Sequence, residues 1–190
     1  MKRNNQNMVG FTLVELMITL VVLAILVSAA APSFIDLVRS NRVASQTNQF
    51  TAALALARSE AVKRNVPVFI CKRNTAGTAC DNSANWEAGW IVFADNDGDS
   101  TLDSGEEIRV FEGLATGYTL RNGVSAYDNW IRYQPRGDAV GSGGTATYSN
   151  VSNTEVFRLC SDAADAAKGR RINIIPSGRV NLVEGTSTCP

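Results

Sequence analysis

Residues 95–106 gather acidic side chains at a spacing that could hold a metal ion. Carboxylates fall at positions 1, 3, 5, 9 and 12 of this segment, as in a calcium-binding loop. They belong to Asp95, Asp97, Asp99, Asp103 and Glu106. The turn-making glycine of such loops is missing, because Ser100 stands at position 6 and Gly98 at position 4. We therefore expect a solvated turn between two strands rather than a calcium site.

The chain has four cysteines, Cys71, Cys80, Cys160 and Cys189, and no histidine. No two of them form a CxxC pair, and without histidine a zinc site would need all four at scattered spacings. The N-terminal sequence indicates that the chain is exported. An even number of cysteines in an exported chain favours two disulfides. Of the three connectivities we expect Cys71–Cys80, which closes a short polar loop, and Cys160–Cys189. Buried free thiols are the alternative.

The lack of histidine also removes the commonest general base and the usual partner of a nucleophilic serine or cysteine. Serine and aspartate are plentiful, but no nucleophile motif or phosphate-binding loop accompanies them. Lys and Arg together number 18, as do Asp and Glu, so the net charge indicates neither a nucleic acid nor an acidic partner. We expect no enzymatic activity and no cofactor.

A local excess of basic residues lies between residues 156 and 180. The candidates for contact with phosphates are Lys168, Arg170, Arg171 and Arg179. Binding a nucleic-acid backbone needs such residues clustered on one face. Charges on a solvated strand edge, where they discourage pairing with other chains, explain the same pattern. Contact with DNA is therefore an alternative that we do not favour.

The N-terminus combines a short polar and basic start with a long apolar run that begins directly after Gly10. Residues 16–35 contain no charge, and about twenty apolar residues in a helix cross a bilayer core. Lys2 and Arg3 would stay on the cytoplasmic side, which places the rest of the chain outside. The small residue precedes the apolar run instead of following it, so cleavage there would leave the helix on the mature protein. An uncleaved signal anchor is the alternative.

Glu15 lies inside this apolar run. A carboxylate in a membrane segment is costly, and such groups usually have a partner and a function. Cleavage after Gly10 would create a partner, the new α-amino group of Phe11. In a filament, Glu15 of one subunit could pair with this amine on a neighbour and set the relative height of the two helices.

The segment Gly10-Phe11-Thr12-Leu13-Val14-Glu15 resembles the prepilin peptidase motif of type IV pilins and type II secretion pseudopilins. The resemblance implies cleavage between Gly10 and Phe11 by a membrane aspartyl peptidase, and N-methylation of Phe11. It also implies that Glu15 governs assembly, and Pro32 matches a proline that many pilins carry in the long helix. Such a proline removes one backbone hydrogen bond and loosens the helix locally.

The rest of the pattern predicts an α+β fold, a long helix packed on an antiparallel sheet. Apolar residues at helical spacing continue the helix to about Arg64, and Asn65 and Pro67 end it. Eight short strands are expected at 68–72, 89–94, 107–111, 118–121, 130–134, 156–160, 171–175 and 179–183. We expect a hairpin turn at 176–178 and a flexible loop at 141–145. Trp86, Trp90 and Trp130 are expected in the core rather than at a ligand surface.

The second half also resembles the GspH/FimT family of minor pilins and pseudopilins. The resemblance rests on residues 57–61 (Ala-Arg-Ser-Glu-Ala), Val66-Pro67-Val68, Cys71, and residues 89–93 followed by Asp95. It implies a minor pilin in the initiating or tip complex of a type IV pilus, with roles in adhesion and twitching motility. The alternatives are an H-type minor pseudopilin of type II secretion, or a DNA-binding minor pilin for natural transformation. Some FimT-type relatives bind DNA through a C-terminal arginine motif, of which only Arg179 matches here.

Three segments follow from these inferences. Residues 1–10 form a leader removed by prepilin peptidase, residues 11–64 a helix that spans the membrane over about 11–35, and residues 65–190 a β-rich head. The expected partners are the peptidase and other minor and major pilins or pseudopilins. Before assembly the chain would be a single-pass inner-membrane protein with a periplasmic head, and afterwards part of a pilus or pseudopilus.

Overall fold

The computed structural model describes residues 11–123, 127–143, 157–161, 168–185 and 189. One helix, α1 (Leu13–Arg64), forms the N-terminal part. Its start is capped by Thr12, whose side-chain oxygen accepts a hydrogen bond of 3.2 Å from the backbone N–H of Glu15. It ends at Asn65, which adopts the left-handed conformation (φ 58°) expected of a C-terminal cap.

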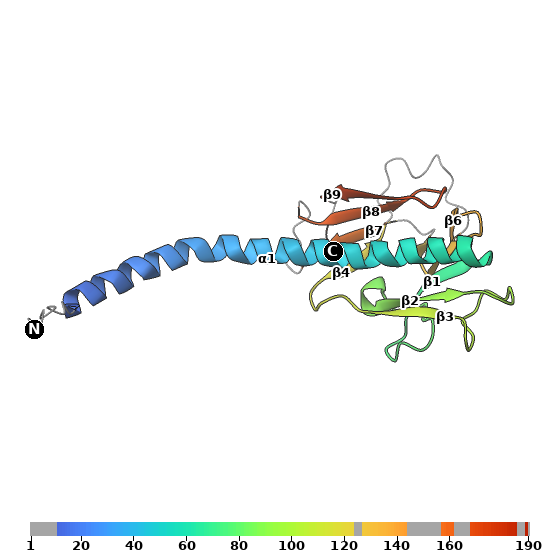
Figure 1. Ribbon diagram of the computed structural model, residues 1–190, viewed down its shortest axis with the longest axis horizontal. Coiled ribbons are helices and arrows are strands. Elements are labelled where there is room, and N and C mark those ends of the chain that lie inside the picture. Colours follow the sequence, from blue (N-terminus) through green and yellow to red (C-terminus); the bar gives the residue numbers. More distant parts are fainter. Residues whose placement is uncertain (1–10, 124–126, 144–156, 162–167, 186–188, 190) are drawn as a thin grey trace, which may run out of the picture. The chain divides into compact units, whose positions relative to one another are not determined.

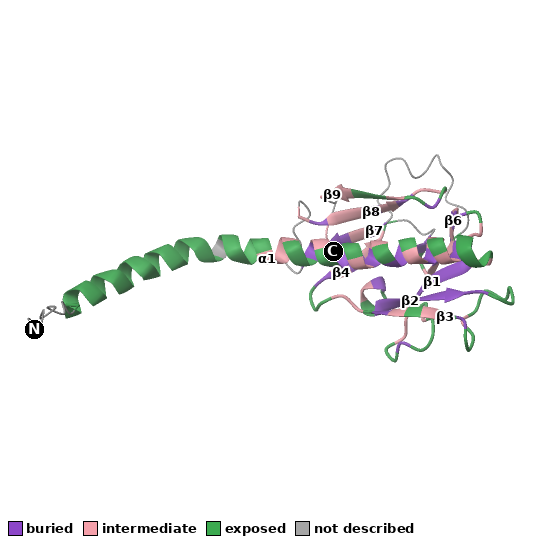
Figure 2. Cartoon of the chain, in the orientation of Figure 1, coloured by how far each residue is buried: buried purple, intermediate pink, exposed green. Residues whose placement is uncertain are grey.

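The chain divides into two compact units, residues 1–39 and residues 40–190. In the first unit the residues 11–37 are exposed, apart from Pro32, whose side chain is not described. Figure 2 shows this part of α1 coloured as exposed, apart from one turn drawn grey. The described apolar side chains of this segment are therefore exposed.

The second unit, which we call the head, contains two antiparallel sheets. The first has the strand order β3-β2-β1-β5-β6, and the second has the order β4-β7-β8-β9. The strands are β1 (Val68–Lys72), β2 (Gly89–Ala94), β3 (Glu107–Glu112), β4 (Thr119–Asn122), β5 (Trp130–Tyr133), β6 (Ala139–Gly141), β7 (Phe157–Cys160), β8 (Arg170–Ile174) and β9 (Val180–Glu184). A single 3-10 turn, η1 (Trp86–Ala88), precedes β2. The α+β prediction is confirmed.

The main core lies between the C-terminal half of α1 and both sheets. The helix contributes a stripe of fully buried side chains at helical spacing: Phe50, Ala53, Leu54, Ala57 and Ala61. Phe50 contacts Trp90 from the first sheet and Phe157 from the second, each at 4.9 Å between ring centroids. Figure 1 shows this half of α1 running across both sheets. The helix therefore joins two sheets that share no strand.

A smaller second core covers the other face of the five-stranded sheet. Alternate residues of β1 point to opposite faces, so Ile70 enters the main core while Phe69 and Cys71 enter the second. β2 divides in the same way, with Ile91 and Phe93 in the second core. All residues of β1 and β2 are buried. The central strands therefore read as continuous apolar runs rather than alternating ones.

Some elements differ from the sequence prediction. The short strand β6 and the turn η1 were not predicted, and Gly141, expected in a flexible loop, is the last residue of β6. The remainder of that expected loop, from residue 144 on, lies outside the described residues. Several other strands begin or end one residue from their expected bounds. The turn at Pro176-Ser177-Gly178 joins β8 to β9 as expected, with a hydrogen bond of 2.8 Å from the Gly178 N–H to the Ile175 carbonyl.

Candidate functional site

The apolar run of residues 11–35 has its one carboxylate, Glu15, in the first turn of α1. Glu15 is the third residue of the helix, and the Thr12 cap fixes its backbone N–H. A carboxylate in this turn interacts favourably with the unpaired N–H groups of the helix start. Phe11, whose amine would be its partner after cleavage, is 79% exposed. Gly10 lies outside the described residues, so the cleavage site itself has no structural account.

The helix that follows has the length and composition of a membrane span. An 18-residue window of α1 has a mean hydropathy of 2.6, and none of that window is buried. About 20 residues of helix cover a bilayer core. Pro32 lies inside α1, well before its packed half begins. The exposed residues 11–37 include the expected span of about 11–35, which stays a prediction.

The head contains two disulfides, and they join the pairs expected from the sequence. Cys71 is bonded to Cys80 over a sequence separation of 9 residues, and Cys160 to Cys189 over 29 residues. Cys71 belongs to β1 and Cys160 to β7, and both are buried. Each bridge therefore ties a peripheral segment to a strand of the head, one bridge in each sheet.

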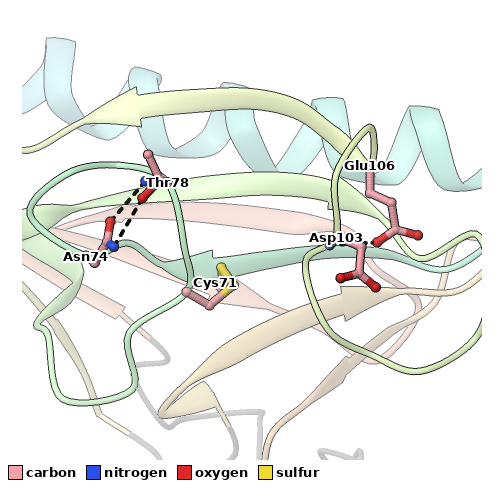
Figure 3. Close-up of a disulfide and its surroundings, with 6 residues drawn as sticks. Cys71, Asn74, Thr78, Asp103 and Glu106 are labelled. Carbon is pink, nitrogen blue, oxygen red and sulfur yellow. Dashed lines mark hydrogen bonds between the residues drawn. A yellow bond between two sulfur atoms is a disulfide. The ribbon is translucent and has the colours of Figure 1, made fainter.

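The acidic loop between β2 and β3 holds itself together through its own carboxylates. Both oxygens of Glu106 accept backbone hydrogen bonds, one from Asn96 at 2.7 Å and one from Asp103 at 3.2 Å. Asp95 accepts a hydrogen bond from the Gly98 N–H at 2.8 Å, and Asp99 accepts one from the Thr101 N–H at 2.7 Å. Figure 3 shows Glu106 beside Asp103 at the base of the loop. This pattern is that of a self-capped turn.

The same loop brings three of the candidate ligands together. Ligand oxygens of Asp95, Asp97 and Asp99 lie within 4.8 Å of one another. Ser100 adopts a left-handed conformation (φ 65°), so the missing glycine does not prevent the turn. Glu106, however, accepts hydrogen bonds from the loop backbone with both of its oxygens and is not part of this group of three. The expectation that the loop is mainly a turn stays a prediction.

The carboxylates of this loop have unequal acidities. Hydrogen bonds from the backbone N–H and the hydroxyl of Thr101 hold the pKa of Asp99 below its ordinary value. The negative charge of Asp99, with partial desolvation and the charges of Asp97 and Glu106, raises the pKa of Asp103. The folded loop therefore disfavours the charged form of Asp103.

The candidate DNA-contacting residues do not share one face. Arg170 and Arg171 are neighbours in β8, and successive residues of a strand point to opposite faces. Arg170 lies on the helix side with Ala44 and Thr47, and it pairs with Glu184 at 3.1 Å. Arg179 precedes β9, and Lys168 precedes β8. The structure therefore does not assemble these four residues into a single basic patch.

A different basic row emerges on the second sheet. Arg121 of β4 stands opposite Arg158 of β7, which stands opposite Arg171 of β8. Arg121 forms an ion pair with Glu87 of η1. The linear sequence could not reveal this row, because the three residues are brought together only by the cross-strand register.

Residues 57–61 connect the helix to both sheets. Ala57 and Ala61 are fully buried, and Arg58 points to two turns. Its guanidinium donates to the carbonyl of Gly137, in the β5–β6 turn, at 3.0 Å, and to that of Ser177, in the β8–β9 turn, at 3.1 Å. The two alanines of this segment therefore pack in the core, while its arginine is hydrogen-bonded to both turns.

Comparison with known protein families settles the relationship that these features indicate. A family model described as type II transport protein GspH matches residues 46–178, well over half of the chain. The chain belongs to this family. A second model, the prokaryotic N-terminal methylation motif, matches residues 10–31. No curated protein gives a significant match.

Two solved structures share the fold of this GspH-family chain. Both are crystal structures of the type IV minor pilin FimU from Pseudomonas aeruginosa strain PAO1. The first is 18% identical, covers 79% of this chain and 96% of its own, and has a TM-score of 0.56. The second is 16% identical, covers 77% and 98%, and has a TM-score of 0.50. At these identities the likeness shows the fold alone.

Taken together, the two family matches and this fold identify a type IV pilin-like protein, a minor pilin or pseudopilin. Proteins of this family and fold are structural subunits. Its apolar N-terminal helix and methylation motif are consistent with membrane anchoring and pilus assembly.

Proposed function

We propose that this protein is a minor pilin of a type IV pilus and a structural subunit of the complex that initiates or tips the filament. The observation that carries the proposal is the exposed apolar helix over residues 11–37, attached to a head with its own core. Such a surface is not stable in water and needs a membrane or neighbouring helices to cover it. Filament assembly requires a subunit whose apolar helix leaves the membrane and packs against the helices of neighbouring subunits.

The pattern at the N-terminus supports the processing steps of this proposal. Residues 1–10 would be removed by prepilin peptidase, and Phe11 would be N-methylated. The helix would span the inner membrane over about residues 11–35 and place the head in the periplasm. Glu15 would then meet the α-amino group of a neighbouring Phe11, and Pro32 would loosen the helix between its exposed and packed parts.

A second candidate is an H-type minor pseudopilin of a type II secretion system. The description of the matched family, type II transport protein GspH, favours it. The likeness to the type IV minor pilin FimU supports the pilus instead. DNA binding remains a third, less favoured function, since the four candidate basic residues do not form one patch.

The test is deletion of the gene, with two readouts in the same strain. We expect fewer surface pili by electron microscopy and weaker twitching, with normal secretion of type II substrates into the medium. Complementation with the intact gene should restore pili. Loss of secretion with a normal pilus count would contradict the pilus role and support the pseudopilin. Normal pili and secretion with reduced DNA uptake would support the third function.

A further inference from the structure

A cleft lies on the face of the five-stranded sheet that points away from α1. Its floor comes from the second core, through Phe69 of β1 and Phe93 of β2, and Trp130 of β5 stands at its side. Two loops form its walls: the loop closed by the Cys71–Cys80 disulfide, and the acidic loop after β2. Its volume is about 360 Å³, within the range of small-molecule sites.

Aromatic rings provide the apolar part of this cleft. Phe69 and Phe93 are stacked at 5.1 Å between centroids, and Trp130 meets Phe69 edge to face at 5.2 Å. The Arg132 guanidinium lies 5.6 Å from the Trp130 ring centroid and 5.7 Å from that of Phe69. Trp86 and Trp90 are buried, whereas Trp130 is only partly buried. Trp130 therefore has ring surface left for a ligand.

The polar part of the cleft is uncharged. Asn82 lines it from the disulfide side, and Ser100 and Thr101 line it from the acidic loop; all three are exposed. None of the described residues that line the cleft carries a charge, but the Arg132 guanidinium lies against two of its rings. A cationic ligand would lose its hydration there, find no counter-charge in the lining and meet the Arg132 cation. A purely apolar ligand would cover the amide and hydroxyl groups without offering them hydrogen bonds.

Both walls are fixed by bonds within their own loops. In the disulfide loop, Asn74 accepts a hydrogen bond from the Thr78 N–H at 3.0 Å, as Figure 3 shows beside Cys71. Lys72 donates to the Asn82 carbonyl at 2.8 Å and so anchors the residue that lines the cleft. The acidic loop is held by Glu106 and Asp99, as described above. A cleft built in advance binds with less loss of conformational freedom.

We propose that this cleft is a carbohydrate site that takes a neutral hexose unit of a glycan. A pyranose ring has a face of C–H groups that packs on an aromatic ring, and a rim of hydroxyls that hydrogen-bond to amides and alcohols. Trp130 supplies the ring surface, and Asn82, Ser100 and Thr101 supply the hydrogen-bonding groups. The neutrality of the lining matches the neutrality of the sugar. This inference does not depend on which filament the chain joins.

Nuclear magnetic resonance of the indole N–H groups tests the proposal on the full-length protein. The protein is labelled with ¹⁵N and solubilised in a detergent whose head group is not a sugar. The probes are the methyl glycosides of glucose, galactose, mannose and N-acetylglucosamine at millimolar concentration. At least one of them should shift the Trp130 signal in a saturable manner. The signals of Trp86 and Trp90, which are 2% and 0% exposed, should stay in place.

Two variants and a matched control separate binding from folding. Asn82→Ala should weaken the affinity several-fold while leaving the three indole signals of the free protein in place. Trp130→Ala should weaken the affinity by about tenfold or more. Because this variant lacks the Trp130 signal, its affinity is measured by saturation-transfer NMR on the sugar. Thr75→Ala changes another exposed residue of the disulfide loop, one that does not line the cleft, and should leave the affinity unchanged.

Three results would overturn the proposal. The first is that no glycoside shifts the Trp130 signal. The second is a shift that Asn82→Ala and Thr75→Ala affect equally. The third is saturation of the Trp130 signal by N-acetyl-tyrosine amide but by none of the sugars, which would make the cleft a contact for an aromatic side chain of another protein.

Discussion

Arg58 of α1 donates a hydrogen bond of 3.0 Å to the backbone carbonyl of Gly137 in the β5–β6 turn. A second bond, of 3.1 Å, joins it to Ser177 in the β8–β9 turn. The two turns belong to different sheets, which share no strand. Besides the apolar core, this guanidinium is therefore a polar link that holds the helix and both sheets in one arrangement.

The first prediction concerns this link. Arg58→Ala should lower the free energy of unfolding by about 1–3 kcal/mol, because two carbonyls lose a charged donor. Arg58→Lys should recover only part of the loss, since an ammonium cannot reach both carbonyls with a planar fork. Denaturant titration of the head measures both.

Arg64 offers the control for that experiment. It pairs with Glu60 at 2.5 Å on the exposed side of the same helix. Arg64→Ala should cost less than about 1 kcal/mol, as surface ion pairs do. Equal losses in Arg58→Ala and Arg64→Ala would show that the Arg58 link adds nothing to the stability of the head.

A second prediction concerns glycine at the adjoining turn. A Cβ atom on Gly178 would lie 1.9 Å from the Gly137 carbonyl oxygen, and the residue has a φ of 77°. Gly178→Ala should therefore destabilise the head by about 3 kcal/mol or more. Gly98 has a similar φ of 86° but nothing within 4 Å of the added carbon. Gly98→Ala should cost only the backbone strain, about 1–2 kcal/mol. Similar losses for the two variants would refute the steric argument.

The regular elements were predictable because their apolar residues follow the period of a helix or of a strand. Strand β6 was not predictable. It has only three residues and runs into a glycine-rich stretch, which is too short to show a helical or a strand period. Cross-strand register is not encoded locally, so neither the row of Arg121, Arg158 and Arg171 nor the cleft beside Trp130 could be inferred from sequence. Asn65, in contrast, could be assigned as a left-handed cap because a local residue preference decides that position.

The third prediction concerns calcium. Calorimetric titration of the protein in detergent should show no binding tighter than about 1 mM. The reason is that Glu106, which would have to supply two oxygens, already accepts two backbone hydrogen bonds that hold the loop. A micromolar affinity that is lost on Asp97→Ala would contradict this interpretation and make the loop a calcium-stabilised element.

The fourth prediction concerns pH. The pKa of Asp103 is raised above its ordinary value of 3.8, chiefly by the charge of Asp99. The ionised Asp103 therefore reduces stability at neutral pH, and this cost disappears once the pH falls below the unfolded pKa. Asp103→Asn should raise the melting temperature at neutral pH and leave it unchanged near about pH 3.

The comparison for that variant is Glu107→Gln, which removes an exposed carboxylate from β3, just outside the loop. It should not raise the melting temperature at neutral pH as Asp103→Asn does. An increase for Asp103→Asn that persists at low pH would mean that the asparagine acts through new hydrogen bonds rather than through relief of repulsion.

The last prediction concerns Glu15, which should be needed for assembly and not for insertion. Burial of the apolar residues that follow it drives insertion at roughly 25 cal/mol per Å², and removing a charge can only favour that step. Helices of uniform hydrophobicity, in contrast, have no preferred relative height in a filament. A carboxylate–amine pair in a low-dielectric environment is directional, and breaking it is strongly unfavourable. Glu15→Ala should therefore give a processed, membrane-resident protein that is depleted from filaments.

Mass spectrometry and fractionation into membranes and sheared filaments measure this outcome, with mature protein beginning at N-methyl-Phe11. Thr12→Ala is the matched control, because it removes the hydroxyl that caps the helix start and leaves the Glu15 charge in place. Its effect should be limited to the cap, about 1 kcal/mol of helix stability. An equal filament defect in a processed Thr12→Ala protein would assign the effect to the helix start instead of the charge. Normal incorporation of the Glu15→Ala protein would show that this subunit enters the filament without the pairing. A subunit at the tip, which has no neighbour above it, would behave in this way.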